Sequence, residues 1–382
     1  MNLLQKYFKN SNYYQIGGND SSLILKPRTI IYIILFIILI YIIYRYIAHI
    51  KIKPTIQDLS GNIIIQPTSL LITIGIESQK SSLGNFIANT TTKHCEEYKK
   101  SDNALKNIQN FVNNYKIKPN SIVGCENISD NDSIQCWKKF NTPNDFFIRQ
   151  RVGLPKTPIE DSLVSPADCY CIYFEDIENS NVWIKGTGFT PQKLMFGSNN
   201  DINLDNYSLF IFRLAPHHYH RYHCPVNGRI IKINKYGENK YSVDPKIVNS
   251  KIDVYSQNVH LVIQIELVDK KIAYLAVIGA TCVASIEITH KNIVNAFHKN
   301  YNTNVKLTDE EIVKRNNVIN LDESNVLIQN NEELGNFQYG GSTLVLIYPN
   351  ENSELTEIGN IIKKNSSNLT ETEIKVGMPL YL

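Results

Sequence analysis

The chain has 382 residues, of which 43% are hydrophobic and 20% are charged, as is typical of a globular protein with a buried core. The formal net charge of +3 at pH 7 is small, so bulk electrostatics do not favour a nucleic-acid partner. The seven cysteines are scattered and include no CxxC pair, so the sequence indicates neither a zinc site nor a disulfide framework.

The N-terminal part contains an apolar run. Residues 1–28 form a predicted polar tail, and residues 29–50 form a predicted transmembrane anchor whose uncharged part runs from Thr29 to Tyr44. A bilayer needs about 20 apolar residues, so the run is long enough only if Arg45 extends to the interface and the residues after it are counted. A signal-type segment or a buried helix is the alternative. Basic residues flank both ends, so neither orientation is favoured.

Two regions of different character follow the anchor. Residues 51–130 are polar with weak periodicity, and we predict a variable spacer with one or two short helices. In residues 131–382, apolar and β-branched segments alternate with turn signals, which predicts a strand-rich single catalytic domain of the α+β class. Thr308 with Glu311 three residues later is typical of a helix N-terminus within this domain.

Near the C-terminus, the stretch Tyr339-Gly340-Gly341-Ser342-Thr343 precedes an apolar run, Leu344 to Tyr348. Two glycines leave the Gly341–Ser342 peptide bond flexible and unshielded, and the run predicts a buried strand that would hold Ser342 in place. A simple turn before a strand is the other interpretation, because Gly-Gly pairs are common in turns.

A histidine-rich segment lies between Arg213 and Pro225, and it contains His217, His218, His220 and His223. Three interpretations are open. The segment could be a metal site that uses His217, His220 or His223 with a carboxylate, or a solvated basic loop. It could also be a catalytic loop in which two histidines move protons in different steps. Pro216 and Pro225 argue against one long helix that presents metal ligands four residues apart.

A third candidate is the segment Val164-Ser165-Pro166-Ala167-Asp168, which precedes a predicted strand, residues 169–174. A turn here would place Asp168 at the start of that strand. Cys169 and Cys171 alternate along the strand, so both thiols face one side and most simply pack in the core. With a histidine and Ser342, Asp168 would complete an Asp–His–Ser relay, in which the carboxylate orients the imidazole and the imidazole takes the hydroxyl proton.

These motifs together resemble the pyruvoyl-dependent phosphatidylserine decarboxylases. The matching segments follow in order: Phe140–Arg149, Val164–Asp168, Trp183–Gly186, Arg213–Pro225, Val277–Ala280 and Glu333–Thr343. The resemblance covers about residues 133–350, and its most specific parts are the histidine-rich segment and the Gly-Gly-Ser-Thr sequence at residues 340–343.

The resemblance implies a two-stage mechanism. Asp168 and His223 would activate Ser342 against the carbonyl of Gly341, which splits a zymogen into a β chain, residues 1–341, and an α chain, residues 342–382. Ser342 would become a covalent pyruvoyl cofactor. This group would form a Schiff base with phosphatidylserine and release CO2 to give phosphatidylethanolamine, with His220 assigned to the decarboxylation step. The enzyme would therefore be a carboxy-lyase of phospholipid biosynthesis, with no metal among its cofactors.

The same resemblance implies phosphatidylserine, a membrane and the protein's own two chains as partners. It leaves open whether the enzyme is a homodimer and in which compartment its single membrane span lies. Three positions differ from the usual family pattern: His218 replaces an Asp, Asn258-Val259-His260 replaces Asn-Glu-Arg, and Cys169 replaces a Gly.

Two other functions stay open from the sequence. One is an Asp–His–Ser hydrolase that never cleaves itself, although Ser342 is not in the G-x-S-x-G turn typical of such enzymes. The other is an inactive, unprocessed homologue that acts as a membrane-bound lipid-binding or scaffold protein. Cleavage of the chain would separate the decarboxylase from both.

Overall fold

The computed structural model describes most of the chain, namely residues 14–16, 23–25, 27–52, 55–64, 97, 103–155, 158–159, 162–177, 190–197, 203–241, 243, 253–280, 285–351 and 353–382. The chain divides into two compact units, one of residues 1–53 with 68–74 and one of residues 54–67 with 75–382. The segment Trp183–Gly186, part of the family resemblance, lies outside the described residues.

The first unit contains a small hairpin and a long helix. Strands β1 (Tyr14–Ile16) and β2 (Leu23–Leu25) pair antiparallel, and α2 spans Pro27–Ile52. The large apolar side chains of α2 from Ile31 to Tyr41 are all exposed, so the helix has no single buried face. Among the residues that the structure describes, no helix has the length and apolar content needed to cross a membrane. The predicted helix is thus present, but its prediction as a transmembrane anchor is not supported by the structure.

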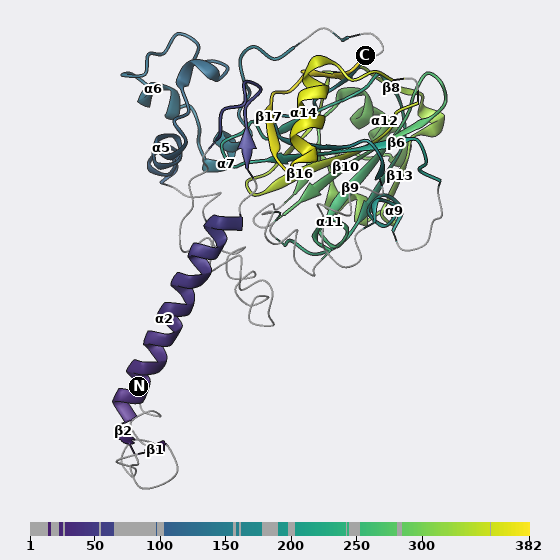
Figure 1. Ribbon diagram of the computed structural model, residues 1–382. Helices are drawn as coiled ribbons and strands as arrows, with labels where there is room; N and C mark the ends of the chain where they lie inside the picture. Colours follow the sequence, from purple (N-terminus) through teal and green to yellow (C-terminus); the bar gives the residue numbers. More distant parts are fainter. Residues whose placement is uncertain are drawn as a thin grey trace. The chain divides into compact units, whose positions relative to one another are not determined.

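Strands dominate the second unit, which confirms the prediction of a strand-rich α+β domain (Figure 1). Its strands are β3 (Ile56–Gln57), β4 (Leu163–Val164), β5 (Cys169–Phe174), β6 (Tyr207–Leu214), β7 (Arg221–His223), β8 (Gly228–Tyr236), β9 (His260–Glu266), β10 (Ile272–Gly279), β11 (Ile286–Ile288), β12 (Leu307–Thr308), β13 (Val318–Asn320), β14 (Val326–Ile328), β15 (Glu333–Phe337), β16 (Ser342–Pro349), β17 (Glu371–Ile374) and β18 (Pro379–Tyr381). Its helices are α5 (Ala104–Tyr115), η1 (Pro119–Ser121), α6 (Ile134–Trp137), α7 (Pro143–Phe147), α9 (Pro191–Phe196), α11 (Val254–Gln257), α12 (Lys291–Tyr301), α13 (Asp309–Val313), η3 (Asp322–Ser324) and α14 (Glu357–Ser367).

The strands form one large sheet and two smaller ones. The order in the large sheet is β13-β8-β9-β10-β16-β6-β5-β17-β3, with β14 also paired to β8. The second sheet has the order β12-β11-β15-β7, and β18 pairs with β4. The pairing of β17 with β3 is parallel, whereas β16 is antiparallel to both of its neighbours, β10 and β6.

Strand β16 lies in the middle of the large sheet and is buried on both faces. Leu344 and Leu346 belong to one hydrophobic core, and Val345 and Ile347 belong to another, because successive side chains of a strand point to opposite faces. The first core also contains residues of β7, β11 and β15, so this face packs against the four-stranded sheet. Ser342 alternates in phase with Leu344 and therefore points toward that sheet.

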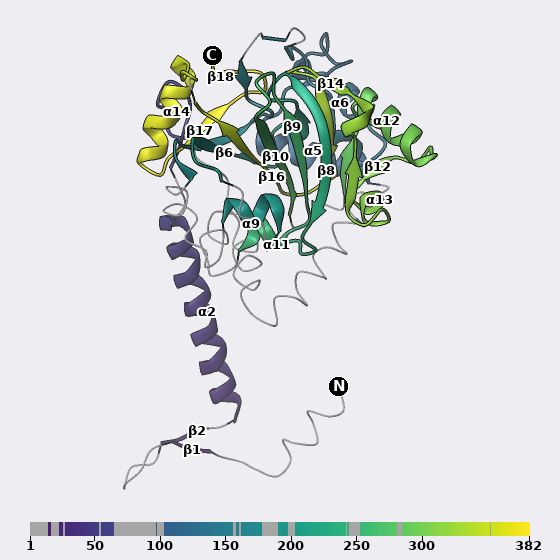
Figure 2. The same cartoon turned by 90° about the vertical axis from the view of Figure 1, so that its right-hand side faces the viewer.

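Helices cover the remaining surfaces. Residues of α9 and α11 enter the core on the face opposite Ser342, and Figure 1 shows the two helices side by side there. Helices α12 and α13 lie beside β14 and β12 (Figure 2), while α14 packs on β5, β17 and β18. Helix α13 begins as predicted, because Thr308 Oγ1 accepts a hydrogen bond of 3.3 Å from the Glu311 amide.

A helical segment precedes the sheets. Helices α5, α6 and α7 share a small apolar core that includes Ile108, Trp137 and Phe146. Helix α5 and strand β3, which adds to the edge of the large sheet, both come from residues 51–130, the predicted spacer. Helix α7 begins with a reciprocal cap, since Thr142 and Asp145 each bond the other's backbone amide.

The sequence prediction about disulfides is wrong. Cys125 and Cys136 form a disulfide within the helical segment, beside Trp137. The two residues are 11 positions apart and belong to no recognised motif, so only the fold of the chain between η1 and α6 reveals that they meet. The other cysteines that the structure describes, Cys169, Cys171 and Cys224, are free and buried, as predicted for Cys169 and Cys171.

Loss of this disulfide is expected to loosen the helical segment. The Cys125→Ser variant should lose about 2–4 kcal/mol of local stability, since the cross-link restricts the unfolded chain. Hydrogen exchange of residues 103–155 measures this, with and without a reductant. Reductant should change exchange in the wild type and have no effect on the variant; identical protection in both proteins would contradict the prediction.

Candidate active site

Ser342 is the first residue of β16 and is fully buried. Its backbone pairs with Gly279 of β10 on one side and with Leu214 of β6 on the other. The preceding Gly340 has φ 149°, a conformation that side-chain-bearing residues rarely adopt, so glycine is required where the chain turns into the strand. The prediction of a turn followed by a buried strand that holds Ser342 is therefore confirmed.

His220 is the histidine in direct contact with Ser342. It precedes β7, and its Nδ1 lies 3.1 Å from Ser342 Oγ. Its Nε2 faces two carbonyl oxygens, of Ala215 at 3.0 Å and of Pro216 at 3.3 Å. Carbonyls only accept, so the ring proton belongs on Nε2 and the lone pair of Nδ1 accepts the Ser342 hydroxyl. Burial, with the charge of Arg149 nearby, holds the pKa of His220 well below its usual range. The imidazole is therefore neutral and able to take a proton from Ser342.

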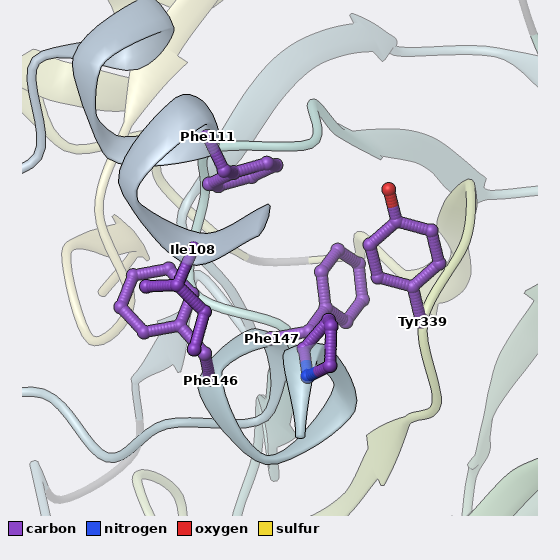
Figure 3. Close-up of a pocket in the computed structure, with 6 residues that line it drawn as sticks. Ile108, Phe111, Phe146, Phe147 and Tyr339 are labelled. Atoms are coloured by element: carbon purple, nitrogen blue, oxygen red, sulfur yellow. The ribbon is translucent and has the colours of Figure 1, made fainter. Parts of the chain in front are cut away.

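Aromatic rings close the other side of His220. The Phe147 ring of α7 stacks on the imidazole with centroids 3.8 Å apart, and Tyr339 tilts onto Phe147 at 4.9 Å. Beyond these rings is a small, partly open pocket, which Figure 3 shows between Phe111 of α5 and Tyr339. Ile108, Phe111, Pro143, Phe146, Phe147 and Tyr339 line the pocket. An apolar pocket thus begins one side chain away from the Ser342–His220 pair.

Asp168 directly precedes β5, as the turn prediction requires, and it is buried. One of its carboxylate oxygens accepts a hydrogen bond of 3.0 Å from the Val376 amide and lies 3.4 Å from an Arg151 guanidinium nitrogen. These contacts hold the carboxylate between β5 and the turn after β17. Its bonded partners are therefore the backbone at Val376 and the Arg151 side chain.

His223 is buried at the end of β7. Its Nδ1 donates to the Asn331 carbonyl at 2.8 Å, so the lone pair is on Nε2, which lies 3.2 Å from the Tyr219 hydroxyl. Burial lowers the pKa of His223, while the Asn331 bond and the charges of Glu333 and Asp168 act in the opposite direction. The charge of Asp168 thus acts on His223, but in this geometry both ring nitrogens bond to groups outside the predicted relay.

His217 and His218 lie together with Glu373, and their ligand atoms are within 4.8 Å of one another. The Ala215 amide donates to Nδ1 of His218 at 3.0 Å, which puts the ring proton on Nε2, the nitrogen that faces Glu373 at 3.7 Å. Burial lowers the pKa of His217 to about 4, with the charge of Glu373 acting in the opposite direction. An Nε2 that carries a proton offers no lone pair to a metal ion. The metal interpretation with His220 or His223 is likewise disfavoured, because their nitrogens have the partners described above.

Two backbone contacts position the segment just before Ser342. The Tyr339 amide donates to the Asn144 side chain at 2.9 Å, and the Gly341 carbonyl accepts from the Ala280 amide at 3.1 Å. Neither contact was expected from the sequence, although Asn144 and Ala280 fall in segments of the family resemblance. The contact with Ala280 could not be found by pattern, since it depends on how β10 ends beside β16.

Residues 342–382 are attached to the rest of the domain by more than the peptide bond at Gly341. β16 hydrogen-bonds to two strands, and β17 continues the same sheet. The Glu371 carboxylate of β17 forms a buried two-point ion pair with Arg213 of β6, in which Nε lies 2.8 Å from Oε1. The guanidinium also lies over the Tyr170 ring at 5.0 Å. A broken bond before Ser342 would therefore leave this segment in its place.

Comparisons with known proteins agree with the site. A family model described as phosphatidylserine decarboxylase matches residues 144–377, a range that includes Asp168, His220, His223 and Ser342. The chain is 35% identical over 256 residues to phosphatidylserine decarboxylase proenzyme 2 of Saccharomyces cerevisiae, covering 65% of this chain and 19% of that one. A rice protein of the same name is 28% identical over 85% of this chain and 46% of its own length.

Bacterial relatives are closer to this chain in length. The phosphatidylserine decarboxylase proenzyme of Clostridium tetani is 27% identical over 248 residues, which are 63% of this chain and 68% of that protein. By contrast, the chain spans about a fifth of the length of the yeast relative and less than half of the length of the rice relative. The family model nevertheless matches more than half of the chain. The chain therefore belongs to the phosphatidylserine decarboxylase family.

Proposed function

We propose that this chain is the proenzyme of a phosphatidylserine decarboxylase that cleaves itself between Gly341 and Ser342. The observation that carries the proposal is the buried Ser342 hydroxyl, which faces the unprotonated nitrogen of a neutral His220 at 3.1 Å. The carbonyl of the preceding residue, Gly341, accepts a hydrogen bond of 3.1 Å from the Ala280 amide. A nucleophile, a base and a polarised carbonyl thus meet at one peptide bond.

The cleavage uses only groups of this chain and one water. The Ser342 hydroxyl loses its proton to a histidine while Oγ bonds to the Gly341 carbon, and the C–N bond breaks to leave an ester and a free amine. Removal of the Cα proton of residue 342 then breaks the Cβ–Oγ bond and releases the Gly341 carboxylate. The remaining enamine rearranges to an imine, and water replaces its nitrogen, which leaves as ammonia. Residue 342 is then a pyruvoyl group at the N-terminus of residues 342–382.

The roles of the two histidines follow the resemblance. We assign self-cleavage to Asp168, His223 and Ser342, and decarboxylation to His220. One observation supports the role of His220, which already lies against the residue that becomes the reacting centre. The same contact permits a second assignment, in which His220 itself takes the Ser342 proton. The variants considered in the Discussion distinguish the two.

The surroundings of residue 342 suit a pyruvoyl group. Residue 342 is fully buried at the start of β16 beside His220, so a carbonyl group at this position would be shielded from bulk water. The group would supply an electron-accepting carbonyl for an amine substrate. His220 would hold or move a proton beside it, and the stacked Phe147 ring would exclude water. The sheet pairing and the Arg213–Glu371 ion pair would keep the two chains together.

Two features support a lipid substrate. The small apolar pocket beside Phe147 and Tyr339 would offer an apolar surface to a phospholipid whose head group reaches residue 342 (Figure 3). The exposed apolar residues of α2, Ile31 to Tyr41, suit contact with a membrane, and we propose that this helix holds the enzyme at the bilayer where its substrate lies. The side of the membrane and the number of copies in the enzyme are left open.

Release of CO2 from vesicles tests the proposed activity. Purified protein is mixed with phosphatidylcholine vesicles that contain phosphatidylserine labelled in its carboxyl group. We expect labelled CO2 and phosphatidylethanolamine from this mixture and none from free labelled serine. A protein that is cut at Gly341 but releases no CO2 from either source would refute the decarboxylase assignment and leave self-cleavage in place.

Self-cleavage is expected to be insensitive to mild acid. An ordinary histidine has a pKa of 6.5, and burial lowers the pKa of both His220 and His223, so their lone pairs stay free as the pH falls through 6.5. The rate of cleavage per folded molecule should therefore remain constant from pH 8 to below 6.5 and then fall. Stability should start to decline earlier, as the pH falls through 6.5, because the histidines of the unfolded chain then bind protons that the buried ones do not. A rate that halves near pH 6.5 would contradict this account.

A further inference from the structure

The peptide group between Gly279 and Ala280 lies at the end of β10, beside the bond that is cleaved. Gly279 is paired with Ser342, and the Ala280 amide donates to the Gly341 carbonyl oxygen at 3.1 Å. That oxygen becomes negatively charged when Ser342 Oγ bonds to the Gly341 carbon. An amide already aimed at it needs no rearrangement to stabilise the charge.

The Asn258 side chain holds the other end of this peptide group. Its Nδ2 donates to the Gly279 carbonyl at 3.0 Å and to the Tyr241 carbonyl at 2.8 Å. Its Oδ1 accepts from the Tyr241 amide at 2.8 Å. These three bonds fix the orientation of the Asn258 amide, since exchanging its oxygen and nitrogen would set like groups against each other. The residue is fully buried, so no water substitutes for it.

The two contacts form a continuous chain of hydrogen bonds. Asn258 Nδ2 bonds the Gly279 carbonyl, and the amide of the same peptide group bonds the Gly341 carbonyl. A hydrogen bond accepted at the oxygen of a peptide group polarises the group and strengthens the bond donated by its N–H. Asn258 therefore fixes the plane of the donor and also increases its strength.

We propose that the Ala280 N–H is the oxyanion donor of self-cleavage and that Asn258 is the positioning residue that orients it. This inference rests on the self-cleavage proposed above and adds the group that receives the developing charge. As Oγ bonds to the Gly341 carbon, the electron pair of the C=O bond moves to oxygen, where the Ala280 N–H meets it. When the C–N bond breaks, the pair returns to re-form the carbonyl of the ester. The N–H is never transferred.

The direct test replaces this N–H with an ester oxygen. Full-length chain is made by cell-free synthesis with an ester in place of the amide of Ala280. The matched control carries the same ester at Ala276, in the middle of β10 opposite Val345. Loss of one oxyanion donor typically lowers a rate by about 10²–10³-fold, so the Ala280 ester should cleave about a hundredfold more slowly than the control. Equal rates for the two esters would overturn the inference.

A second test addresses Asn258. In an Asn258→Asp variant, burial against two carbonyl oxygens raises the pKa of the new carboxyl, so the test is made at alkaline pH. There the carboxylate has no hydrogen to donate to Gly279, and cleavage should slow at least about tenfold. Protonation at lower pH restores an O–H donor, so the rate per folded molecule should rise as the pH falls. The control is Asn234→Asp. Asn234 is a buried asparagine of β8, and its Nδ2 donates a hydrogen bond to the Tyr236 hydroxyl. Its rate should not rise in acid.

The outcomes separate this inference from the proposal on which it rests. Folded protein is measured by circular dichroism at each pH, so that a loss of folding is not read as a slow reaction. An Asn258→Asp variant that cleaves at the wild-type rate at alkaline pH would refute the positioning role. A wild-type chain that stays uncut would refute self-cleavage itself, whereas a cut wild type with an equally fast Ala280 ester would refute only the oxyanion donor.

Discussion

A Ser342→Ala variant is expected to remain a single uncut chain that releases no CO2. Without Oγ, nothing can attack the Gly341 carbonyl, and no ester forms that could be eliminated to give the pyruvoyl group. The change removes one buried hydroxyl and its bond to His220, a loss of about 1 kcal/mol, so the protein should still fold. Denaturing electrophoresis should show one band, where the wild type gives residues 1–341 and residues 342–382.

The matched control for this variant is Ser208→Ala. Ser208 is a fully buried serine of β6, and its hydroxyl bonds the Tyr348 carbonyl of β16 at 3.3 Å. It therefore belongs to the same sheet but does not contact the site. The control should be cut as fully as the wild type. Cleavage of the Ser342→Ala chain between residues 341 and 342 would remove the basis of the whole proposal.

The second large effect is expected from the histidines. His223→Ala and Asp168→Ala should both remain uncut, because the proposed assignment makes His223 the base of the attack and Asp168 the carboxylate that supports it. His220→Ala should be cut at least in part, more slowly because it loses the contact with Ser342, and should release no CO2. Time courses of cleavage and of CO2 release, measured on the same samples, separate the two stages.

The reverse pattern would reassign the roles. If His220→Ala remains uncut while His223→Ala is cut at the wild-type rate, then the base of self-cleavage is the histidine that contacts Ser342 in this geometry. A His220→Ala variant with full decarboxylase activity would contradict both assignments. His298→Ala is the control, since this histidine of α12 bonds the Val305 carbonyl away from the site. It should be cut and active.

Local patterns in the sequence predict the parts of the site that depend on neighbouring residues. The β-branched run after Gly341 predicts β16, the Ser-Pro-Ala-Asp turn places Asp168 at the start of β5, and Thr308 predicts the start of α13. In each case, the residues that decide the structure lie within a few positions of one another. Such preferences act through the backbone and need no distant partner.

Contacts between distant segments could not be predicted in the same way. The sequence cannot show that His220, rather than His223, faces Ser342, because this depends on how the four-stranded sheet packs against β16. The disulfide of Cys125 with Cys136 and the bond from Ala280 to Gly341 arise likewise from tertiary packing. The length of the apolar run after Thr29 was also not enough to predict whether the helix crosses a membrane.

Mass spectrometry of the purified wild-type protein tests the central claim most directly. We predict two polypeptides, residues 1–341 and residues 342–382. The smaller should be lighter by one ammonia than a serine-initiated fragment, and its N-terminus should be closed to Edman sequencing. Both consequences follow if residue 342 is a pyruvoyl group. A single intact chain of 43.7 kDa, or a fragment that begins with an unmodified serine, would contradict the account.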